Sequence, residues 1–421
     1  MKNSLAVGII SLGCPRNLVD SETIVSILSQ RGHRLVSPEE AEVVFINTCA
    51  FIEEAKKETI DTILEFAQLK KRGRLKKLIV CGCLVQRYKK KLIKLLPEVD
   101  GFIGAPELLV KSPRICLTPP FYKYLKICEG CINNCSYCVI PKIKGSLKSA
   151  PSTDILDVVR DFNREGVAEL NIIGQDITAY GLDYGIKNGL VKLLEKVYRH
   201  SKNIHWLRLL YLSPERITKD LIFFIKEHPR ICRYLDIPIQ HCSNRILKLM
   251  NRRISFSSIC RLIEMVRKYI PDICLRTSII VGFPQETEKE FKQLLNFIRN
   301  VQFERLGAFM YSPEEGTPAC NFTGQIHHSI KKARYRQLMF TQQEVARLVN
   351  KRFFNKTLEV LIEENASDHY LGRTQYDAPE VDGLVYVHSK QRLSVGEFVK
   401  VRIIDTLDYD LVGEVINESS Q

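Results

Sequence analysis

The chain has 421 residues, enough for two or three domains, and its 45% hydrophobic and 26% charged content is ordinary for a soluble globular protein. No stretch is apolar enough to span a bilayer, and the segment Met1 to Leu12 lacks the features of a signal peptide. Fourteen cysteines, several in tight clusters, predict metal ligands in a reducing compartment, so we expect a cytoplasmic protein.

The first 118 residues alternate strands and helices, which predicts an α/β domain with a flavodoxin-like parallel sheet. Short β-branched or apolar runs predict its strands, and helical patterns lie between them. The predicted strands are Ala6–Leu12, Val43–Asn47 and Lys77–Cys81, and the helices are Ser21–Arg31 and Glu53–Leu69.

One cysteine follows each of these three strands. Cys14, Cys49 and Cys83 stand in the contexts SLGCPRN, NTCAF and CGCLVQR. Loops beyond the carboxyl ends of parallel strands meet at one edge of the sheet, so the three thiols are expected to converge there on a metal cluster. Unrelated buried cysteines are the alternative, since such thiols are common in cores. Cys81 ends its strand and is left out of the ligand set.

A linker with three prolines, residues 111–120, precedes a second alternating pattern, which predicts a central domain over residues 119–352. Six strand–helix repeats predict a partial (β/α) barrel, with its chemistry at the carboxyl ends of the strands. The predicted strands are Tyr124–Cys128, Glu169–Ile173, Trp206–Tyr211, Tyr234–Ile237, Leu275–Val281 and Arg305–Met310. The helices include Thr153–Asn163, Leu190–His200, Glu288–Asn300 and a closing Ile330–Asn350.

Three further cysteines lie in the run CINNCSYC, at Cys131, Cys135 and Cys138, directly after the first barrel strand. An iron–sulfur cluster normally takes four cysteine ligands, so three would leave one iron open to a substrate or cofactor. This spacing is neither the paired CxxC of a zinc ribbon nor a ferredoxin run. A zinc knuckle or chance clustering is the alternative.

Residues 353–421 change character, because β-forming runs alternate with turns. Leu358–Ile362, Leu384–Val387, Phe398–Ile403 and Leu411–Val415 predict a small antiparallel β-barrel. This segment holds 6 Lys or Arg and 13 Asp or Glu, a net charge of −7, whereas the whole chain carries +14 and residues 1–352 therefore +21. A basic body attracts RNA, and an acidic domain favours a basic partner.

With both cysteine sets placed, the chain resembles the radical S-adenosylmethionine (SAM) methylthiotransferases over nearly its whole length. That family joins an N-terminal cluster domain, a radical SAM domain and a C-terminal TRAM domain. SLGCPRN, YLDIPIQH (residues 234–241), GRTQYDAPEVDG (372–383) and GQDITAYGLDYG (174–185) resemble the branch that modifies an aspartate of a small-subunit ribosomal protein. The branch that modifies tRNA typically has Gly-Cys-Gln-Met-Asn at the first motif.

The resemblance implies two 4Fe-4S clusters and SAM as cofactors. The cluster on Cys131, Cys135 and Cys138 would bind and cleave SAM, and the resulting radical would take hydrogen from the β-carbon of an aspartate. The cluster on Cys14, Cys49 and Cys83 would deliver a methylthio group. A low-potential electron donor such as flavodoxin or ferredoxin, and a sulfur source, are implied partners. An unactivated C–H bond offers no acidic proton, so no catalytic acid or base is predicted beyond the cluster ligands.

Weaker predictions concern SAM itself. The loops after the barrel strands supply polar groups and glycines that could contact it, although a polar loop cap, a core ion pair or a plain turn would explain each of them as well. These candidates are Gly174, Gln175, Asp176, Arg208, Gln240 and Gly282. His241 is expected to be a pocket residue or a satisfied core histidine.

Three positions depart from the family pattern. Gln285 stands where the family usually has a second glycine in Gly-Phe-Pro-Gly-Glu, so the turn is expected to adjust if that glycine needs a positive φ. Cys128 and Cys242 stand where small residues are usual. A fourth cluster ligand at Cys128 would close the open iron, but its place on the strand argues against that.

Two alternatives remain. A tRNA methylthiotransferase acting on an adenosine would use the same cofactors, but its TRAM domain should be basic. The net charge of −7 instead suits a basic ribosomal protein, with Asp377, Glu380 and Asp382 as an expected docking surface. A non-catalytic RNA-binding or electron-carrying protein would need no open iron, so SAM binding to the reconstituted cluster would separate it from the enzymes.

Overall fold

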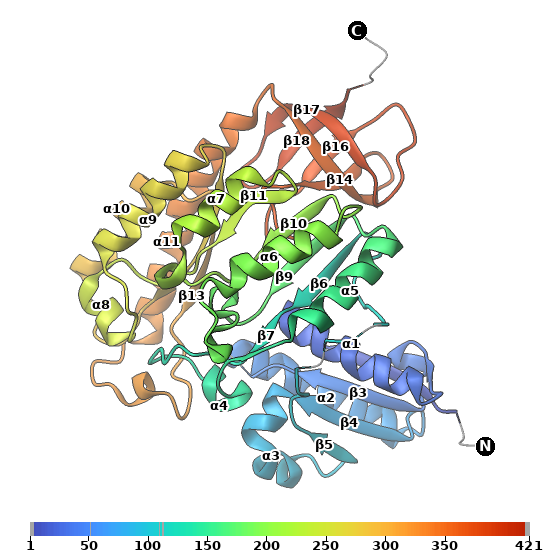
Figure 1. Ribbon diagram of the computed structural model, residues 1–421. Helices are drawn as coiled ribbons and strands as arrows, with labels where there is room; N and C mark the ends of the chain where they lie inside the picture. Colours follow the sequence, from blue (N-terminus) through green and yellow to red (C-terminus); the bar gives the residue numbers. More distant parts are fainter. Residues whose placement is uncertain (1–3, 51, 109, 112, 417–421) are drawn as a thin grey trace.

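The structure is a computed structural model that describes residues 4–416 apart from 51, 109 and 112 (Figure 1). The N-terminal domain is a five-stranded parallel sheet in the order β2-β1-β3-β4-β5, the flavodoxin-like order expected from the sequence. Its strands are β1 (Ala6–Ser11), β2 (Arg34–Leu35), β3 (Val43–Thr48), β4 (Lys77–Gly82) and β5 (Gly101–Ile103), and its helices are α1 (Pro15–Gln30), α2 (Glu53–Lys71) and α3 (Cys83–Leu95).

Helix α1 begins six residues before the predicted start. Pro15 occupies its first position, where a missing backbone N–H costs nothing, and Cys14 is the N-cap. The apolar pattern used for the prediction starts only at Ser21, since the first turn faces another domain. This correction matters because it makes Arg16 part of a helix that begins at a predicted cluster ligand.

The central domain is a six-stranded parallel sheet in the order β13-β12-β11-β10-β9-β6, curved into a partial barrel with helices outside it. Its strands are β6 (Tyr122–Lys126), β9 (Glu169–Ile173), β10 (Trp206–Leu209), β11 (Ile231–Asp236), β12 (Cys274–Val281) and β13 (Arg305–Met310). Its main helices are α5 (Ser152–Glu165), α6 (Gly189–His200), α7 (Lys219–Glu227), α8 (Asn244–Leu249), α9 (Phe256–Tyr269), α10 (Glu288–Val301) and α11 (His328–Asn350). A short excursion holds β7 (Cys128–Glu129), α4 (Ile140–Lys144) and β8 (Lys148–Ser149).

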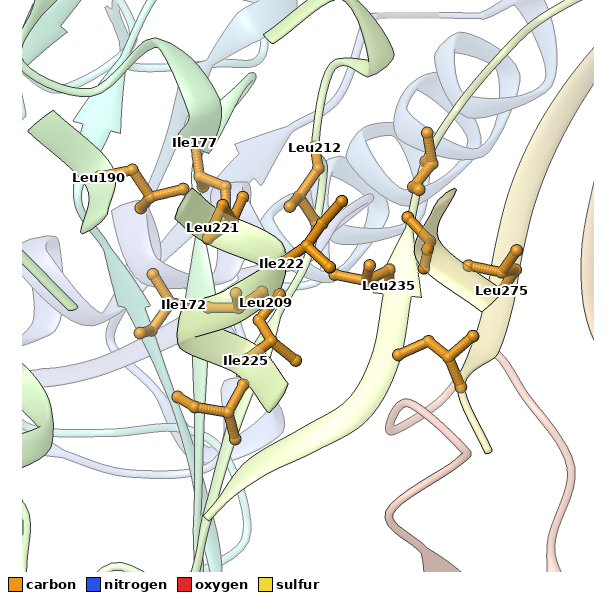
Figure 2. Packing of buried hydrophobic residues seen from close by; sticks show 14 of the residues in the cluster. Ile172, Ile177, Leu190, Leu209, Leu212, Leu221, Ile222, Ile225, Leu235 and Leu275 are labelled. Carbon is orange, nitrogen blue, oxygen red and sulfur yellow. The ribbon is translucent and has the colours of Figure 1, made fainter. Parts of the chain in front are cut away.

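Strands β6, β9 and β10 of the barrel are buried on both faces, and the two faces of the sheet differ in chemistry. Side chains that point outward, such as Ile172, Leu209 and Leu235, pack against Ile222 and Ile225 of α7 (Figure 2). The alternate residues point inward and are aromatic or charged, because successive side chains in a strand face opposite ways. They include Tyr124, Glu169, Arg208, Tyr234 and Arg276.

The C-terminal domain is a closed barrel of β14 (Thr357–Asn365), β15 (Tyr370–Thr374), β16 (Val385–His388), β18 (Leu411–Val415) and β17 (Phe398–Thr406). The predicted antiparallel barrel needs one correction, because β16 and β18 pair in parallel. Strand β15 was not predicted, since its Gly372 and two charged or polar residues hide the strand pattern.

The other two domains cover the concave face of the partial barrel at its two ends. Helix α1 packs against β6, with Val19 in the same apolar cluster as Tyr124 and Tyr234. Leu361 and Ala378 of the C-terminal domain join that cluster from the other side, near the strand starts. Figure 1 shows the blue N-terminal and red C-terminal domains on opposite sides of the central domain. The boundaries at 118 and 352 stay a prediction.

Candidate active site

The first cysteine trio gathers at the carboxyl edge of the N-terminal sheet, where the strand–loop pattern predicted it. Cys14 is the N-cap of α1, Cys49 follows β3, and Cys83 is the first residue of α3. A side chain on Gly13 would come within 2.9 Å of the Cys49 sulfur, so the first two loops are in contact. Burial, together with the nearby Cys14 and Cys49 thiols, raises the pKa of Cys83 to about 12.

The second trio lies in the loop between β7 and α4. The backbone N–H of Asn133 donates to the Cys131 sulfur at 3.4 Å, and the N–H of Cys138 donates to the Cys135 carbonyl at 3.1 Å. Burial raises the pKa of Cys138 to about 12, and the thiols of Cys135 and Cys131 add to the increase. The three sulfurs are therefore close enough to repel one another as thiolates.

The two trios have the donor chemistry that iron–sulfur clusters need. Three mutually repelling thiols hold their protons until a cation replaces them, and a coordinated metal deprotonates a thiol outright. Cys14 and Cys83 also stand at helix N-termini, where the positive end of the helix dipole favours negative charge. Across the described part of the chain, no three ligand side chains gather tightly enough to hold a single metal ion.

Arg16 lies between the two trios. Burial raises the pKa of Cys14, but the adjacent Arg16 charge and the hydrogen bonds to the thiol from Arg16 and Asn17 together lower it below its ordinary value. The same guanidinium offsets a small part of the increase in the pKa of Cys138 in the other trio. The guanidinium carbon of Arg16 lies 4.4 Å from the ring centroid of Tyr211. Tyr211 follows β10, and its backbone has a φ of 65°. A bulky residue with positive φ is strained, and such strain clusters at functional sites.

A buried ion network fixes the N-terminal domain beside the second trio. The Asp20 carboxylate of α1 accepts from the Lys144 ammonium group at 2.6 Å, and Lys144 is the last residue of α4. Asp20 also pairs with Lys126. Lys126 lies 2.5 Å from Glu129, which in turn accepts from Gln175. Removing one partner of such a network leaves an uncompensated buried charge. The network therefore sets the orientation of the two trios.

The candidate SAM-contacting residues that follow β9 lie against the loop of the second cysteine trio. Asp176 accepts from Asn133 of that loop at 3.0 Å, pairs with Arg216 at 2.9 Å, and caps the short helix that follows by accepting from Thr178. Asp176 is therefore a polar cap, which was the alternative to a SAM contact. It also positions the loop that carries the second cysteine trio. A side chain on Gly174 would meet the Cys128 sulfur at 2.5 Å, so this glycine permits a close approach to a core thiol.

Arg208 faces the C-terminal domain. It is fully buried, donates to Glu169 at 2.6 Å, and donates to the Gln375 carbonyl at 2.7 Å. The sequence left open whether Arg208 pairs with the SAM carboxylate or with a carboxylate of the core. In the structure it pairs with a core carboxylate, Glu169. Arg208 is therefore a structural cation at a domain interface.

The remaining candidates lie at the ends of β11 and β12. Gln240 has a φ of 70°, and its backbone pairs with Ser278 and Ile280. Gly282 has a φ of 69°, and a side chain there would meet Lys331 of α11 at 2.5 Å. Nothing else in the structure places SAM against either residue, so their role stays a prediction.

Gln285 corrects one expectation about the turn after β12. The turn does not adjust, because Gln285 itself adopts a φ of 67°. His241 nearby is a fully buried core histidine whose Nδ1 accepts from the Ser243 N–H at 2.9 Å, but its other ring nitrogen has no hydrogen-bond partner among the described residues, so it is only half satisfied. Its Nε2 lies 3.6 Å from Glu286, beyond hydrogen-bonding distance.

The cysteines left out of the ligand sets are core residues. Cys81 is buried and lies 3.5 Å from the Ile46 carbonyl, and burial raises its pKa to about 12. Cys128 is fully buried against the Asp176 carbonyl, and burial raises its pKa far above the ordinary value. Cys242 is also fully buried.

The predicted acidic docking surface is wrong for two of its three residues, because the Asp377 and Asp382 side chains are buried against the central barrel while Glu380 is exposed. Asp377 accepts from Arg305 at 2.8 Å, and Asp382 accepts from the Tyr234 hydroxyl at 2.6 Å. Glu380 accepts from the Tyr122 hydroxyl at 2.6 Å. Among the described residues of this domain, six acids and five bases are exposed, so most of its net charge of −7 is not displayed outward. The acids are Glu359, Glu364, Asp368, Glu380, Asp405 and Glu414, and the bases are Lys356, Lys390, Arg392, Lys400 and Arg402.

Three residues with a place in the site were not predicted. Arg16 stands two residues after Cys14, and that spacing was the only available signal. Tyr211 ends a predicted strand, but nothing in the sequence indicates its positive φ. Asp20 looked like a surface residue of a helix whose start was misplaced.

Comparisons with known proteins agree with this architecture. Residues 6–104 match the uncharacterized protein family UPF0004, residues 125–298 the radical SAM superfamily, and residues 356–416 the TRAM domain. The solved structure of the radical SAM methyltransferase TsrM from Kitasatospora setae, with cobalamin and a [4Fe-4S] cluster bound, has a TM-score of 0.54. The likeness covers 75% of this chain and 77% of that one at 13% identity, and it indicates the fold alone. None of the described helices combines the length and apolar character needed to cross a membrane.

The superfamily match and the partial barrel with its cysteine loop define a radical SAM enzyme. Relatives that match over their full length identify the family within this class of enzymes. The ribosomal protein uS12 methylthiotransferase RimO of Clostridioides difficile (strain 630) is 46% identical over 98% of this chain and 99% of its own length. That of Citrifermentans bemidjiense is 43% identical, over 99% of both chains. The chain belongs to the RimO family of radical SAM methylthiotransferases.

Proposed function

We propose that this protein attaches a methylthio group to the β-carbon of an aspartate in the small-subunit ribosomal protein uS12. The observation that carries the proposal is that α1, which begins after Cys14 of one trio, is joined through Asp20 to Lys144 of α4, the helix that follows the other trio. Replacement of a C–H bond by C–S at an unactivated carbon needs hydrogen removal and sulfur delivery close together. The two trios, held by a buried ion network, supply two such positions.

Cys131, Cys135 and Cys138 would hold one 4Fe-4S cluster, and Cys14, Cys49 and Cys83 the other. When bound, the first cluster with SAM supplies the radical that opens the C–H bond, and the second supplies sulfur. The reaction also needs a low-potential electron donor of the flavodoxin or ferredoxin type and a sulfur source. The chain's own contribution is to orient these groups and to keep water out.

Arg16 would bind the carboxylate of the target aspartate. Two guanidinium groups lie near Tyr211, but Arg276 is already neutralised by Asp236 and Asp382, each at 3.3 Å. Arg16 has no carboxylate within ion-pair distance among the described residues, and its planar fork of donors matches a carboxylate. Stacking on Tyr211 holds the guanidinium in place. Bound to Arg16 through its carboxylate, the target aspartate would have its β-carbon close to both cysteine trios.

The test is direct. The anaerobically reconstituted protein is incubated with SAM, sulfide and a reductant, and with either small ribosomal subunits or tRNA. Mass spectrometry should find one methylthio group on uS12 and none on tRNA. An adduct on tRNA alone would replace this proposal with the adenosine-modifying activity.

A further inference from the structure

A basic cavity of about 780 Å³ opens on the face of the barrel where the strands end, between the loop after β10 and helices α8 and α9. Figure 1 shows these two helices on the outer side of the central domain, away from the C-terminal barrel. Four cations and a single carboxylate line the cavity, and most of its other polar groups are serines and asparagines. The cations are Lys248, Arg252, Arg253 and Arg261, and the carboxylate is Glu215.

Only one of the four cations is neutralised. Arg252 pairs with Glu215 at 2.9 Å. Lys248, Arg253 and Arg261 have no carboxylate within ion-pair distance in the described part of the chain, and Arg253 and Arg261 are exposed. The cavity therefore presents about three uncompensated positive charges to solvent. Such a concentration of one sign raises the association rate of a partner with opposite charge.

The wall of this cavity also supports the loop of the second trio. The Asn251 amide donates to the Asn134 carbonyl at 2.6 Å, and the Ser136 hydroxyl donates to the Leu249 carbonyl at 2.7 Å. The Ser136 N–H donates to the Met250 carbonyl at 3.0 Å. Arg252, which lines the cavity, also contacts the Cys135 thiol. A molecule seated in the cavity is thus separated from a predicted cluster ligand by one side chain.

We propose that this basic cavity is the docking surface for an acidic electron-carrier protein of the flavodoxin or ferredoxin type. The inference rests on the proposed function, since only a cluster on Cys131, Cys135 and Cys138 needs an electron there. Charge and position favour the same partner. The three cations without a carboxylate partner attract an acidic protein surface. The residues between the cavity and the loop of the second trio would place that protein beside the cluster. Encounters between redox proteins use small interfaces, which a single cavity and its rim can supply.

The experiment measures reduction of the cluster, with no ribosomal protein present. The triple variant K248E/R253E/R261E is reconstituted anaerobically and mixed in a stopped-flow instrument with fully reduced flavodoxin, or with dithionite as a small reductant. We expect the second-order rate with flavodoxin to fall at least about tenfold at low salt and to lose most of its salt dependence. The dithionite rate should fall by a much smaller factor, because this reductant is a small anion, and the bound iron should match wild type, which shows that the variant is folded and loaded.

A matched control reverses three equally exposed cations on the C-terminal domain, K356E/K390E/R392E, and should leave both rates unchanged. Equal flavodoxin rates in wild type and the cavity variant would overturn the inference, as would an equal decrease in the control. Weaker binding of a ribosomal RNA fragment with an unchanged flavodoxin rate would make the cavity an RNA contact and also overturn it. Failure of the methylthio transfer assay beside a decreased flavodoxin rate would instead count against the proposed substrate alone.

Discussion

The guanidinium carbon of Arg16 lies 4.4 Å from the ring centroid of Tyr211, so the first turn of an N-terminal helix stacks on a strained residue of the central barrel. This contact joins the two domains at the point where their cysteine trios converge. Apart from its hydrogen bond to Cys14, the guanidinium has no carboxylate partner within ion-pair distance among the described residues. Two predictions follow from the position of Arg16 and of the trio beside it.

Replacing Arg16 should remove recognition of the substrate's carboxylate. A uS12 peptide with its target aspartate should bind the reconstituted wild-type protein more tightly than the same peptide with asparagine, by about 1.5–3 kcal/mol, as expected for a charged hydrogen bond. In R16Q this difference should vanish, and R16K should restore part of it. Calorimetric titration of both peptides measures the effect. An unchanged difference in R16Q would exclude Arg16 as the anchor, even if uS12 is modified.

Loss of a single cysteine should separate the two chemistries. C14A should lose about half of the bound iron, since one of two four-iron clusters loses a ligand, and should still cleave SAM while failing to transfer sulfur. C81A is the matched control, because Cys81 ends the adjacent strand but is a buried core thiol. It should retain all of the iron and both activities. Loss of SAM cleavage in C14A would contradict the division of labour between the trios.

Reversing the inward-facing acids should loosen the C-terminal domain. D377K/D382K leaves Arg305 without its carboxylate, removes one of the two carboxylates that pair with Arg276, and buries two further cations, which costs about 3–5 kcal/mol for each broken buried pair. Hydrogen exchange should then accelerate in β11, β12 and β15. E364K/D368K makes the same charge change on exposed residues and should exchange like wild type. Equal protection in both variants would contradict the interface.

Much of this arrangement follows from local sequence rules, and the exceptions share one cause. Strands β9, β13 and β18 were predicted to the residue, because their apolar runs are bounded by turns. The convergence of Cys14, Cys49 and Cys83 followed from the rule that parallel strands end at one edge. Long-range pairing is what the sequence concealed. Asp377 and Arg305 are 72 positions apart, so a carboxylate that looked like part of a docking surface is instead paired inside the domain interface.

Stability should depend on Glu169 in a predictable pH range. Burial raises the pKa of this carboxyl, but Arg208 and Arg373 outweigh burial and lower it below its usual value. Because the folded pKa lies below the unfolded pKa, the stabilisation is fully present above the unfolded pKa of about 4.3 and is lost as pH falls through the folded pKa. The thermal midpoint of the metal-free protein should therefore fall below pH 4.

E169Q tests that assignment, because it should be less stable than wild type at pH 7, by about 3–5 kcal/mol, and should show a shallower acid decrease. E364Q, at an exposed position, is the control and should follow the wild-type profile. Parallel acid profiles for wild type and E169Q would mean that other carboxylates dominate the acid response.

The turn after β12 stores strain at Gln285. A non-glycine residue in the left-handed region costs about 1–2 kcal/mol, and Gln285 has a φ of 67°. Its backbone N–H donates to the Gly324 carbonyl at 2.8 Å, and its carbonyl accepts from Arg245 at 2.6 Å, so the turn is fixed from two sides. Q285G should therefore be more stable than Q285A by about 1 kcal/mol, since both lose the same side-chain bond to Thr323 while only glycine relieves the strain. Chemical denaturation of the two variants side by side measures the difference. A more stable Q285A would show that the turn relaxes when the side chain is removed.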